Sequence, residues 1–365
     1  MSEFDHEELA AQGESLQAKI DQARETGDVA LLAGLLRAWG TYTAVEGRLD
    51  ESRKALGEAL ERYQDLEDDL AQTGVLHDMG QLQNALGDPE AALKLYDKAL
   101  ACGKRAGDPD AQFVVLHDRA SLLVDMGRVE EAYETYRKGC DLCEMAGDDG
   151  SRYAMIQGWA ELCVEEEDLD EAMTLWKQNQ AIADEYDDTV RKAECLQVIG
   201  GLLVEQEQFS EARETLELAL TTARSNYDAA QELALLLELG EVHVELEAPV
   251  EAARCFEAAR IKAEETEAPQ GVAQAWLALG NVSRDTEELR TAAQRYAKAG
   301  ALFKELGDDE GVAIALHRRG GVLLELGETD EAREQLEAAL LRYDVVGDDL
   351  GLAVVKQALA RVERA

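Results

Sequence analysis

The chain has 365 residues, of which 46% are hydrophobic and only 4 are proline, so it is neither a disordered chain nor one rich in helix breakers. Its formal net charge is −41, from 77 acidic and 36 basic residues, which disfavours nucleic acid and anionic membrane surfaces as partners. No segment approaches the about 20 consecutive apolar residues that a membrane-spanning helix requires.

The first residues are acidic and lead into no apolar core, so we expect no secretory signal and a cytoplasmic protein. The six cysteines are scattered through apolar helical sequence, which indicates reduced thiols. The acidic excess is compatible with a functional acidic face and equally with adaptation to high salt.

Residues 1–30 predict an amino-terminal capping helix. Its apolar residues recur at helical spacing, and a glycine and an aspartate then supply a C-cap and the next N-cap. The apolar positions are Leu9, Leu16, Ile20 and Ala23, and the caps are Gly27 and Asp28.

A forty-residue period then runs over residues 31–350 and predicts eight helix–turn–helix units. Residues 351–365 place apolar side chains on one face and predict a closing helix at the carboxyl-terminal end. The alternation of apolar and charged residues is helical nearly throughout, so the expected fold class is all-α.

Three aligned columns carry the period. A small residue in the first helix of each unit recurs as Gly40, Gly80, Ala120, Ala160, Gly200, Gly240, Gly280 and Gly320. A small residue early in the second helix recurs as Ser52, Ala92, Ala132, Ala172, Ala212, Ala252, Ala292 and Ala332. A large one follows as Leu56, Tyr96, Tyr136, Trp176, Leu216, Phe256, Tyr296 and Leu336. We expect the small columns to mark close helix approach and the large column to fill the gap between neighbouring units, each side chain contributing about 1.5–3 kcal/mol on burial.

The turns inside the units also align, with glycine at Gly47, Gly87, Gly127 and Gly327. Units four to seven have glutamate there instead, at Glu167, Glu207, Glu247 and Glu287. This turn must therefore tolerate a residue other than glycine. Between units, Gly-Asp pairs at Gly107, Gly147, Gly307 and Gly347 predict the same ending and restarting of helices.

These columns resemble the tetratricopeptide repeat, which has a large residue and Leu-Gly on the first helix and Ala, an aromatic residue and Ala on the second. The positions that match are Leu236, Leu239, Gly240, Ala252, Phe256 and Ala259, then Trp276, Leu279, Gly280, Ala292, Tyr296 and Ala299. The usual unit has about 34 residues, so this one is similar to the extended repeats of Pins, LGN and kinesin light chain. The resemblance implies a right-handed superhelical solenoid, capped at both ends, whose first helices line a concave surface that binds proteins.

The resemblance further implies that three columns on the first helices face this groove. Their polar members are candidate partner-binding residues: Arg37, His77, His117, Gln157, Gln197 and His317; Gln81, Glu161, Glu241 and Asn281; and Asn84 and Arg284.

A carboxylate follows the last of these columns in six consecutive units, as Asp125, Glu165, Glu205, Glu245, Asp285 and Glu325. Stacked helices lie about 10 Å apart, so we expect an acidic ladder. Our hypothesis is that the ladder receives a peptide or helical segment bearing Lys or Arg. The alternative is that these are ordinary solvated carboxylates of a very acidic protein.

Nothing in the chain predicts catalysis, a metal or a cofactor. Successive members of the histidine column, such as His77 and His117, would be about 10 Å apart, too far to share an ion at ligand distances of about 2.0–2.1 Å. Cys140 and Cys143 have redox-motif spacing but lie inside a predicted helix.

Three arginines interrupt apolar columns: Arg119, Arg318 and Arg319. We expect them to pair with carboxylates, with anchoring of an acidic residue or carboxyl terminus of a peptide as the alternative.

The sequence therefore favours a non-enzymatic scaffold or adaptor that binds a protein or peptide. Two alternatives stay open: a regulatory sensor whose superhelix responds to a peptide, and a structural element that assembles with itself. The partner and the oligomeric state are not specified by these residues.

Overall fold

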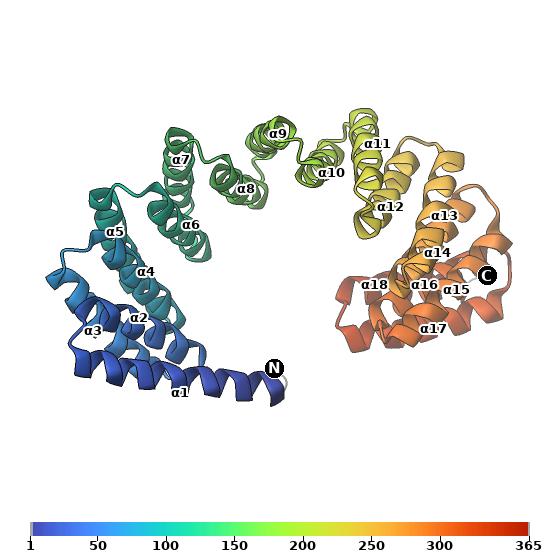
Figure 1. Ribbon diagram of the computed structural model, residues 1–365. Helices are drawn as coiled ribbons and strands as arrows, with labels where there is room; N and C mark the ends of the chain where they lie inside the picture. Colours follow the sequence, from blue (N-terminus) through green and yellow to red (C-terminus); the bar gives the residue numbers. More distant parts are fainter. Residues whose placement is uncertain (1–2, 364–365) are drawn as a thin grey trace. The chain divides into compact units, whose positions relative to one another are not determined.

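The computed structural model describes residues 3–363, with side chains from residue 13 onward, and this range is helical between short turns (Figure 1). The helices are α1 (Glu3–Thr26), α2 (Val29–Val45), α3 (Leu49–Asp65), α4 (Asp69–Ala85), α5 (Pro89–Ala106), α6 (Pro109–Asp125), α7 (Val129–Ala146), α8 (Asp149–Glu165), α9 (Leu169–Glu185), α10 (Thr189–Glu205), α11 (Phe209–Ser225), α12 (Ala229–Glu245), α13 (Pro249–Glu265), α14 (Pro269–Asp285), α15 (Leu289–Leu306), α16 (Asp309–Glu325), α17 (Thr329–Val346) and α18 (Asp349–Val362).

The predicted all-α class is confirmed: across residues 3–363 there are eighteen helices and no strand, packed as a repeating solenoid of the tetratricopeptide type. In the leading helix, Ile20 and Ala23 are both buried, whereas Leu9 lies outside the described side chains. No helix in the described range is long and apolar enough to cross a membrane.

A turn follows every twenty residues. Each turn contains one residue in the left-handed αL conformation. Nine of these residues are glycine, from Gly27 to Gly347, and eight others in the described range are not. The glutamates predicted to replace glycine keep the same conformation, with φ of 61° at Glu167 and 52° at Glu247. A non-glycine residue costs about 1–2 kcal/mol there, so these turns carry strain.

The residue after each αL position caps the next helix. Aspartate fills this place in front of most first helices, and its carboxylate accepts from the backbone N–H three residues later. Asp108, for example, accepts from Ala111 N at 2.8 Å. The predicted end-and-restart chemistry of the Gly-Asp pairs is confirmed.

The small and large columns meet inside each hairpin. A Cβ added to Gly240 would lie 2.3 Å from the ring of Phe256, and one added to Gly280 would lie 2.6 Å from the ring of Tyr296. The expectation that the large residue fills the gap between neighbouring repeats was incomplete, because this residue also packs on the glycine of its own repeat. The alanines of the second helices, from Ala92 to Ala332, are fully buried.

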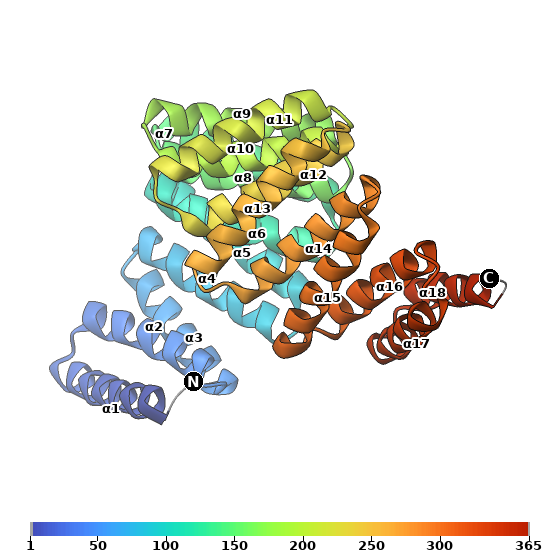
Figure 2. The same ribbon diagram turned by 90° about the vertical axis from the view of Figure 1, so that its right-hand side faces the viewer.

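The chain divides into two compact units, Met1–Leu175 and Trp176–Ala365. Consecutive helices pack against one another from α1 to α8 in the first unit and from α10 to α18 in the second, as α14, α15 and α16 do in Figure 2. The first helices also contact each other, α2 with α4, α4 with α6 and α6 with α8 in the first unit, and α12 with α14 in the second. Each unit therefore has a surface made by first helices, which we call its first-helix face.

The division into a leading helix, eight repeats over residues 31–350 and a closing helix stays a prediction, as does the handedness of the superhelix.

Candidate partner-binding site

In the first unit, the candidate Arg37 on α2 is engaged by the next repeat. Its Nε and Nη2 donate to the two carboxylate oxygens of Asp78 on α4, at 2.6 and 3.1 Å. The guanidinium lies across Gly74, where an added Cβ would come within 2.3 Å of it. The ion pair raises the pKa of Arg37, with the hydrogen bond to Asp78 as the main cause. Arg37 thus joins two repeats.

The same pattern recurs one repeat later, where Asp118 on α6 binds two side chains of α4. His77 Nε2 and Gln81 Nε2 each lie 2.8 Å from Oδ2 of Asp118, and both donate because a carboxylate only accepts. Burial favours a raised pKa for Asp118, but hydrogen bonds from His117, His77 and Gln81 hold it well below its usual range. The pKa of His117 is raised, chiefly by its hydrogen bond to Asp118.

The contacts of Arg37 and His77 follow one rule, in which a candidate residue binds the residue 41 positions later, whereas Gln81 binds Asp118 from 37 positions before it. It holds again in the second unit, where Gln197 donates to Glu238 at 2.6 Å. Asp78, Asp118 and Glu238 were not among the site residues predicted from the sequence. Each directly follows a candidate column, and that adjacency was the available signal.

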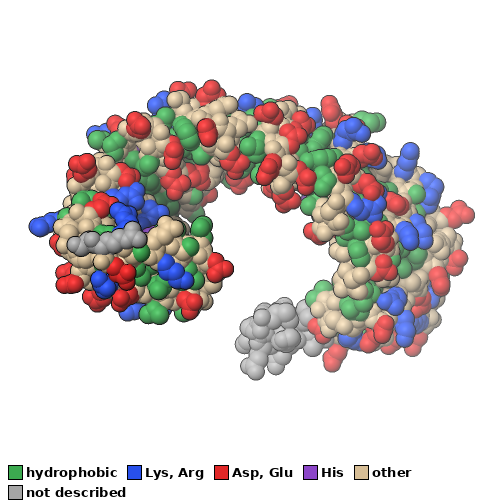
Figure 3. Space-filling model, turned by 180° about the vertical axis from the view of Figure 1, so that it is seen from behind, with side chains coloured by type: hydrophobic (Ala, Val, Ile, Leu, Met, Phe, Trp, Pro, Cys, Tyr) green, Lys and Arg blue, Asp and Glu red, His purple; other side chains and the backbone are tan. Residues whose placement is uncertain are grey.

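The carboxylates of the predicted ladder all lie at the last residue of a first helix and are exposed to solvent. Among the described side chains, only Asp285 of this set has an ion pair, with Arg284 at 2.7 Å. The negative end of a helix dipole disfavours an anion at this position by roughly 0.3–1 kcal/mol. Figure 3 shows acidic side chains over much of the visible surface, with fewer basic ones between them.

Three further candidates of the first unit, Asn84, Gln157 and Glu161, lie on the first helices α4 and α8. Asn84 is exposed near the end of α4. On α8, Gln157 donates to Glu161 at 2.9 Å, so these two bind each other along one helix.

In the second unit, α12, α14 and α16 surround a pocket of about 430 Å³, which we call the Leu237 pocket. Leu237, Leu277 and Phe256 supply apolar walls, and Glu238 and Glu241 supply carboxylates. Desolvation raises the pKa of both glutamates. Glu238 is held by Gln197, whereas no described side chain donates to Glu241.

At its far end the Leu237 pocket reaches Asn281 and Arg318. Asn281 Oδ1 accepts from the Tyr296 hydroxyl at 2.9 Å and from Arg318 Nη1 at 2.5 Å. Arg318 also lines a second pocket of about 350 Å³ with Arg284, His317 and Glu325. Desolvation and the neighbouring Arg318 lower the pKa of His317. The structure thus brings Glu241, Asn281, Arg284, His317 and Glu325 to adjoining pockets.

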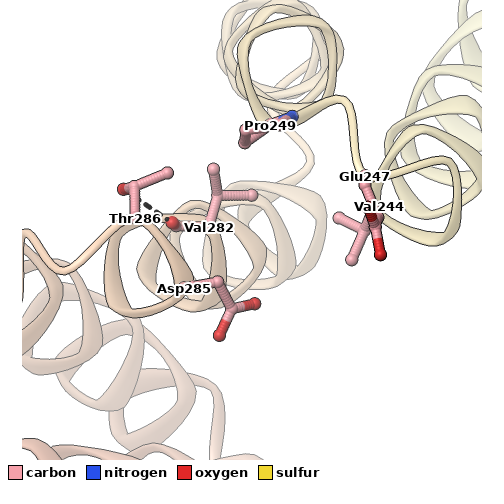
Figure 4. A pocket seen from close by; sticks show the side chains of 6 residues that line it. All are labelled: Val244, Glu247, Pro249, Val282, Asp285 and Thr286. Atoms are coloured by element: carbon pink, nitrogen blue, oxygen red, sulfur yellow. Dashed lines mark hydrogen bonds between the residues drawn. The ribbon is translucent and has the colours of Figure 1, made fainter.

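A third pocket, of about 270 Å³, lies beside one step of the ladder. Figure 4 shows Val244 near the end of α12 and Glu247 in the turn that follows on one side, and Val282 and Asp285 from the end of α14 on the other. Glu205, Glu245, Asp285 and Glu325 all belong to the second unit, so four ladder carboxylates share one compact body.

The prediction that the interrupting arginines pair with carboxylates is confirmed for Arg119, whose Nε donates to Asp97 at 3.1 Å. It is wrong for the other two, because Arg318 binds the amide oxygen of Asn281 and Arg319 binds that of Gln335 at 3.1 Å.

The cysteines of the described range are free thiols. Burial raises the pKa of Cys140 to about 12 and that of Cys143 to about 11, so neither is an activated nucleophile. No group of three His, Cys, Asp or Glu side chains among the described residues is arranged to hold a metal ion.

The sequence profile of the tetratricopeptide repeat matches residues 31–105 and 73–145 of this chain. No curated protein matches its sequence significantly.

Among solved structures, the apo form of RapI is similar at 11% identity, with 91% of this chain and 98% of that chain covered and a TM-score of 0.61. Aspartyl phosphate phosphatase F from Bacillus subtilis is similar at 13% identity, with 92% and 94% covered and a TM-score of 0.54. A putative kinesin light chain from Podosopora anserina, with nearly identical TPR-like repeats, matches at 18% identity, with 55% and 98% covered and a TM-score of 0.45. At these identities the first two likenesses show the fold alone, and the third supports no further conclusion.

Proposed function

We propose that this chain is a non-enzymatic binding scaffold, and that the first-helix face of its second unit receives a peptide or helical segment bearing Lys or Arg. The observation that carries the proposal is the position of Glu241, a solvent-exposed carboxylate without a described partner that lines the Leu237 pocket beside Leu237 and Leu277. Desolvation penalises the charged form of this group, and a ligand cation at hydrogen-bonding distance would offset that penalty.

The apolar walls of the Leu237 pocket suit the aliphatic part of a Lys or Arg side chain. Such a side chain has an aliphatic stem that packs on apolar surface while its charged head reaches a polar group. Leu237 and Leu277 provide the apolar surface, and Glu241 provides the anion. Glu238 is less available, because Gln197 already binds it.

The ladder supports the same choice of ligand. Glu205, Glu245 and Glu325 end their helices without an ion pair in the described structure, where the helix dipole adds to their negative charge. A cationic segment running past these helix ends would relieve that repulsion. In the first unit, by contrast, Arg37, His77 and Gln81 are engaged in contacts between repeats, so we place the ligand on the second unit.

Peptide libraries with one fixed central residue test this proposal directly. Libraries fixed as Lys, Gln or Glu are each passed over the immobilised full chain, and the retained fraction is measured at low and high salt. We expect the Lys library to be retained most, and its retention to fall as salt rises, since exposed charges are then screened.

Two substitutions locate the site. Glu241→Gln removes the charge but preserves size, and we expect Lys-peptide affinity to fall by about tenfold, the equivalent of about 1.4 kcal/mol. Glu337→Gln removes the same charge from an exposed position on α17 and serves as the control. Equal retention of the three libraries, or equal losses in the two variants, would rule out this site.

A further inference from the structure

A separate pocket of about 320 Å³ lies between α15, α16 and α17, and none of the candidate partner-binding residues lines it. Three basic side chains line it, Lys304, Arg319 and Arg342, in a chain whose net charge is −41. We call it the Arg319 pocket. Its floor is apolar, because Val312 and Ala315 are buried.

An arginine at the equivalent position of an earlier repeat shows which groups of the protein can satisfy such a guanidinium. Arg119 occupies the place of Arg319 five repeats before it, 200 residues earlier in the sequence. Its Nε donates to the carboxylate of Asp97 at 3.1 Å, and its Nη1 donates to Thr135 Oγ1 at 2.5 Å. The guanidinium of Arg119 is thus satisfied by one carboxylate and one neutral oxygen, both within the protein.

Arg319 has no such carboxylate beside it among the described residues. The counterpart of Asp97 is Ala297, which lines the Arg319 pocket, and the counterpart of Thr135 is Gln335. Arg319 Nη1 keeps its neutral partner and donates to Gln335 at 3.1 Å. Its Nε is buried, and no group in the described structure accepts its proton. An unsatisfied buried donor of this kind destabilises the folded chain, and a bound acceptor would relieve it.

The space for a ligand arises from the same comparison. Leu100 and Leu142 of the earlier repeat pack against the core cluster there, and their counterparts are Gly300 and Arg342. A Cβ added to Gly300 would meet one neighbouring side-chain atom within 4 Å, the Cβ of Ala315 at 3.3 Å. Loss of the leucine side chain therefore opens the volume, and loss of the aspartate leaves the cation.

The geometry points to the Arg319 pocket as a binding site for an organic carboxylate, whose anionic end takes the place that Asp97 fills beside Arg119. Its apolar body lies on Val312 and Ala315. Lys304 is exposed at the pocket and has no ion pair in the described structure, so it adds a second free cation. Arg342 is already paired with Asp309.

A carboxylate fits this pocket better than an inorganic oxyanion does. Arginine binds carboxylates through parallel N–H donors. The buried apolar floor favours a ligand with an apolar group beside its charge, whereas a fully hydrated phosphate would lose solvation there without replacement.

Saturation-transfer NMR with benzoate as the probe tests the site on the full chain. We expect transfer from the wild-type chain to benzoate, and displacement of benzoate by butyrate. Ala297→Asp restores an internal carboxylate, and Gly300→Leu fills the volume as Leu100 does. Each is expected to weaken benzoate binding by at least about tenfold, because the introduced group competes with the ligand for its site.

The control is Ala101→Asp, an exposed position on α5 that adds the same charge but does not line the pocket. It should bind benzoate as the wild type does. Circular dichroism checks that Gly300→Leu retains its helices, and Ala297→Asp tests the site without filling it.

The source of the carboxylate is resolved by a second pair of probes, a capped peptide with one glutamate and its glutamine counterpart. Displacement of benzoate by the glutamate peptide alone would identify a protein side chain as a ligand, and displacement only by free acids would identify a small molecule. No transfer to benzoate, transfer retained in both variants, or displacement by phosphate but not by butyrate would overturn the assignment.

Discussion

Arg37 and Asp78 form a two-point ion pair between the first helices of successive repeats, with donor–acceptor distances of 2.6 and 3.1 Å. The Asp78 side chain is only 10% exposed, so its loss would leave a partly buried guanidinium without its anion. Asp78→Ala is therefore expected to lower the free energy of unfolding by about 1–3 kcal/mol. Urea denaturation measures this, with Glu61→Ala at an exposed site of α3 as the control. Equal effects of the two substitutions would contradict a structural role for the pair.

Asp118 should make the stability depend on acid. Its folded-state pKa lies below the unfolded value, so its ionised form contributes stability that is present above about pH 4. That contribution is lost as pH falls through the folded-state pKa. Asp118→Asn is expected to cost about 1–3 kcal/mol at pH 7, and the difference from wild type should shrink below about pH 4. A difference that is constant from pH 7 to pH 3 would exclude this linkage.

Glu238 should act in the opposite direction, because desolvation raises its folded-state pKa. Its contribution to stability is fully present below the unfolded pKa of about 4.3 and is lost as pH rises through the folded value. Glu238→Gln keeps an acceptor for Gln197 and removes the charge. We expect it to raise stability at pH 7 by up to about 1 kcal/mol, with no gain near pH 4, as followed by thermal unfolding at several pH values.

Two glycines on first helices should respond oppositely to alanine. At Gly240 the new methyl group would overlap the ring of Phe256, and overpacking typically costs about 1–3 kcal/mol. At Gly201 nothing lies within 4 Å, so alanine should stabilise α10 by about 0.5–1 kcal/mol through its higher helix propensity. Chemical denaturation of both variants measures the contrast, and a loss of stability in Gly201→Ala would show that this surface is packed.

Tyr227 isolates the strain of the non-glycine turns. It has φ of 57° and is 93% exposed, so replacing its side chain removes almost no packing. Tyr227→Gly relieves about 1–2 kcal/mol of αL strain, and the added freedom of the unfolded chain offsets about 0.4–1 kcal/mol of this gain. A net increase in thermal stability is expected, whereas Tyr227→Ala keeps the strain and should change little. Equal stability of the two variants would mean that the turn is relaxed.

The all-α class and the positions of the turns could be predicted from the sequence, because the same local interactions recur in each repeat. Glycine opposite a large residue, as at Gly280 and Tyr296, marks close helix approach at any position in the chain. Asp108 and its equivalents mark helix starts, because the aspartate carboxylate accepts a hydrogen bond from the backbone N–H three residues later. Such signals need no knowledge of tertiary structure.

The site was predicted less fully, because its decisive contacts join repeats. The contacts of Asp78 with Arg37 and of Asp118 with His77 depend on how neighbouring first helices are rotated about their axes, which the sequence does not specify. Arg318 was assigned to a carboxylate because acidic residues are abundant, but its neighbour across the helix pair is Asn281. The abundance of acidic residues therefore predicted an acidic environment for Arg318, but it did not predict which side chain accepts its hydrogen bond.

The recurring αL turns also determine what kind of rearrangement this chain can absorb. The turns inside and between repeats each contain one residue with positive φ, and φ is 67° at Gly127 inside a repeat and 70° at Gly147 between repeats. Inserting or deleting forty residues at such a turn would keep first and second helices in alternation. A change of twenty residues would join just as smoothly and still reverse which surface each later helix presents. Gene duplication in this chain is thus constrained by the identity of the helix faces rather than by the turns.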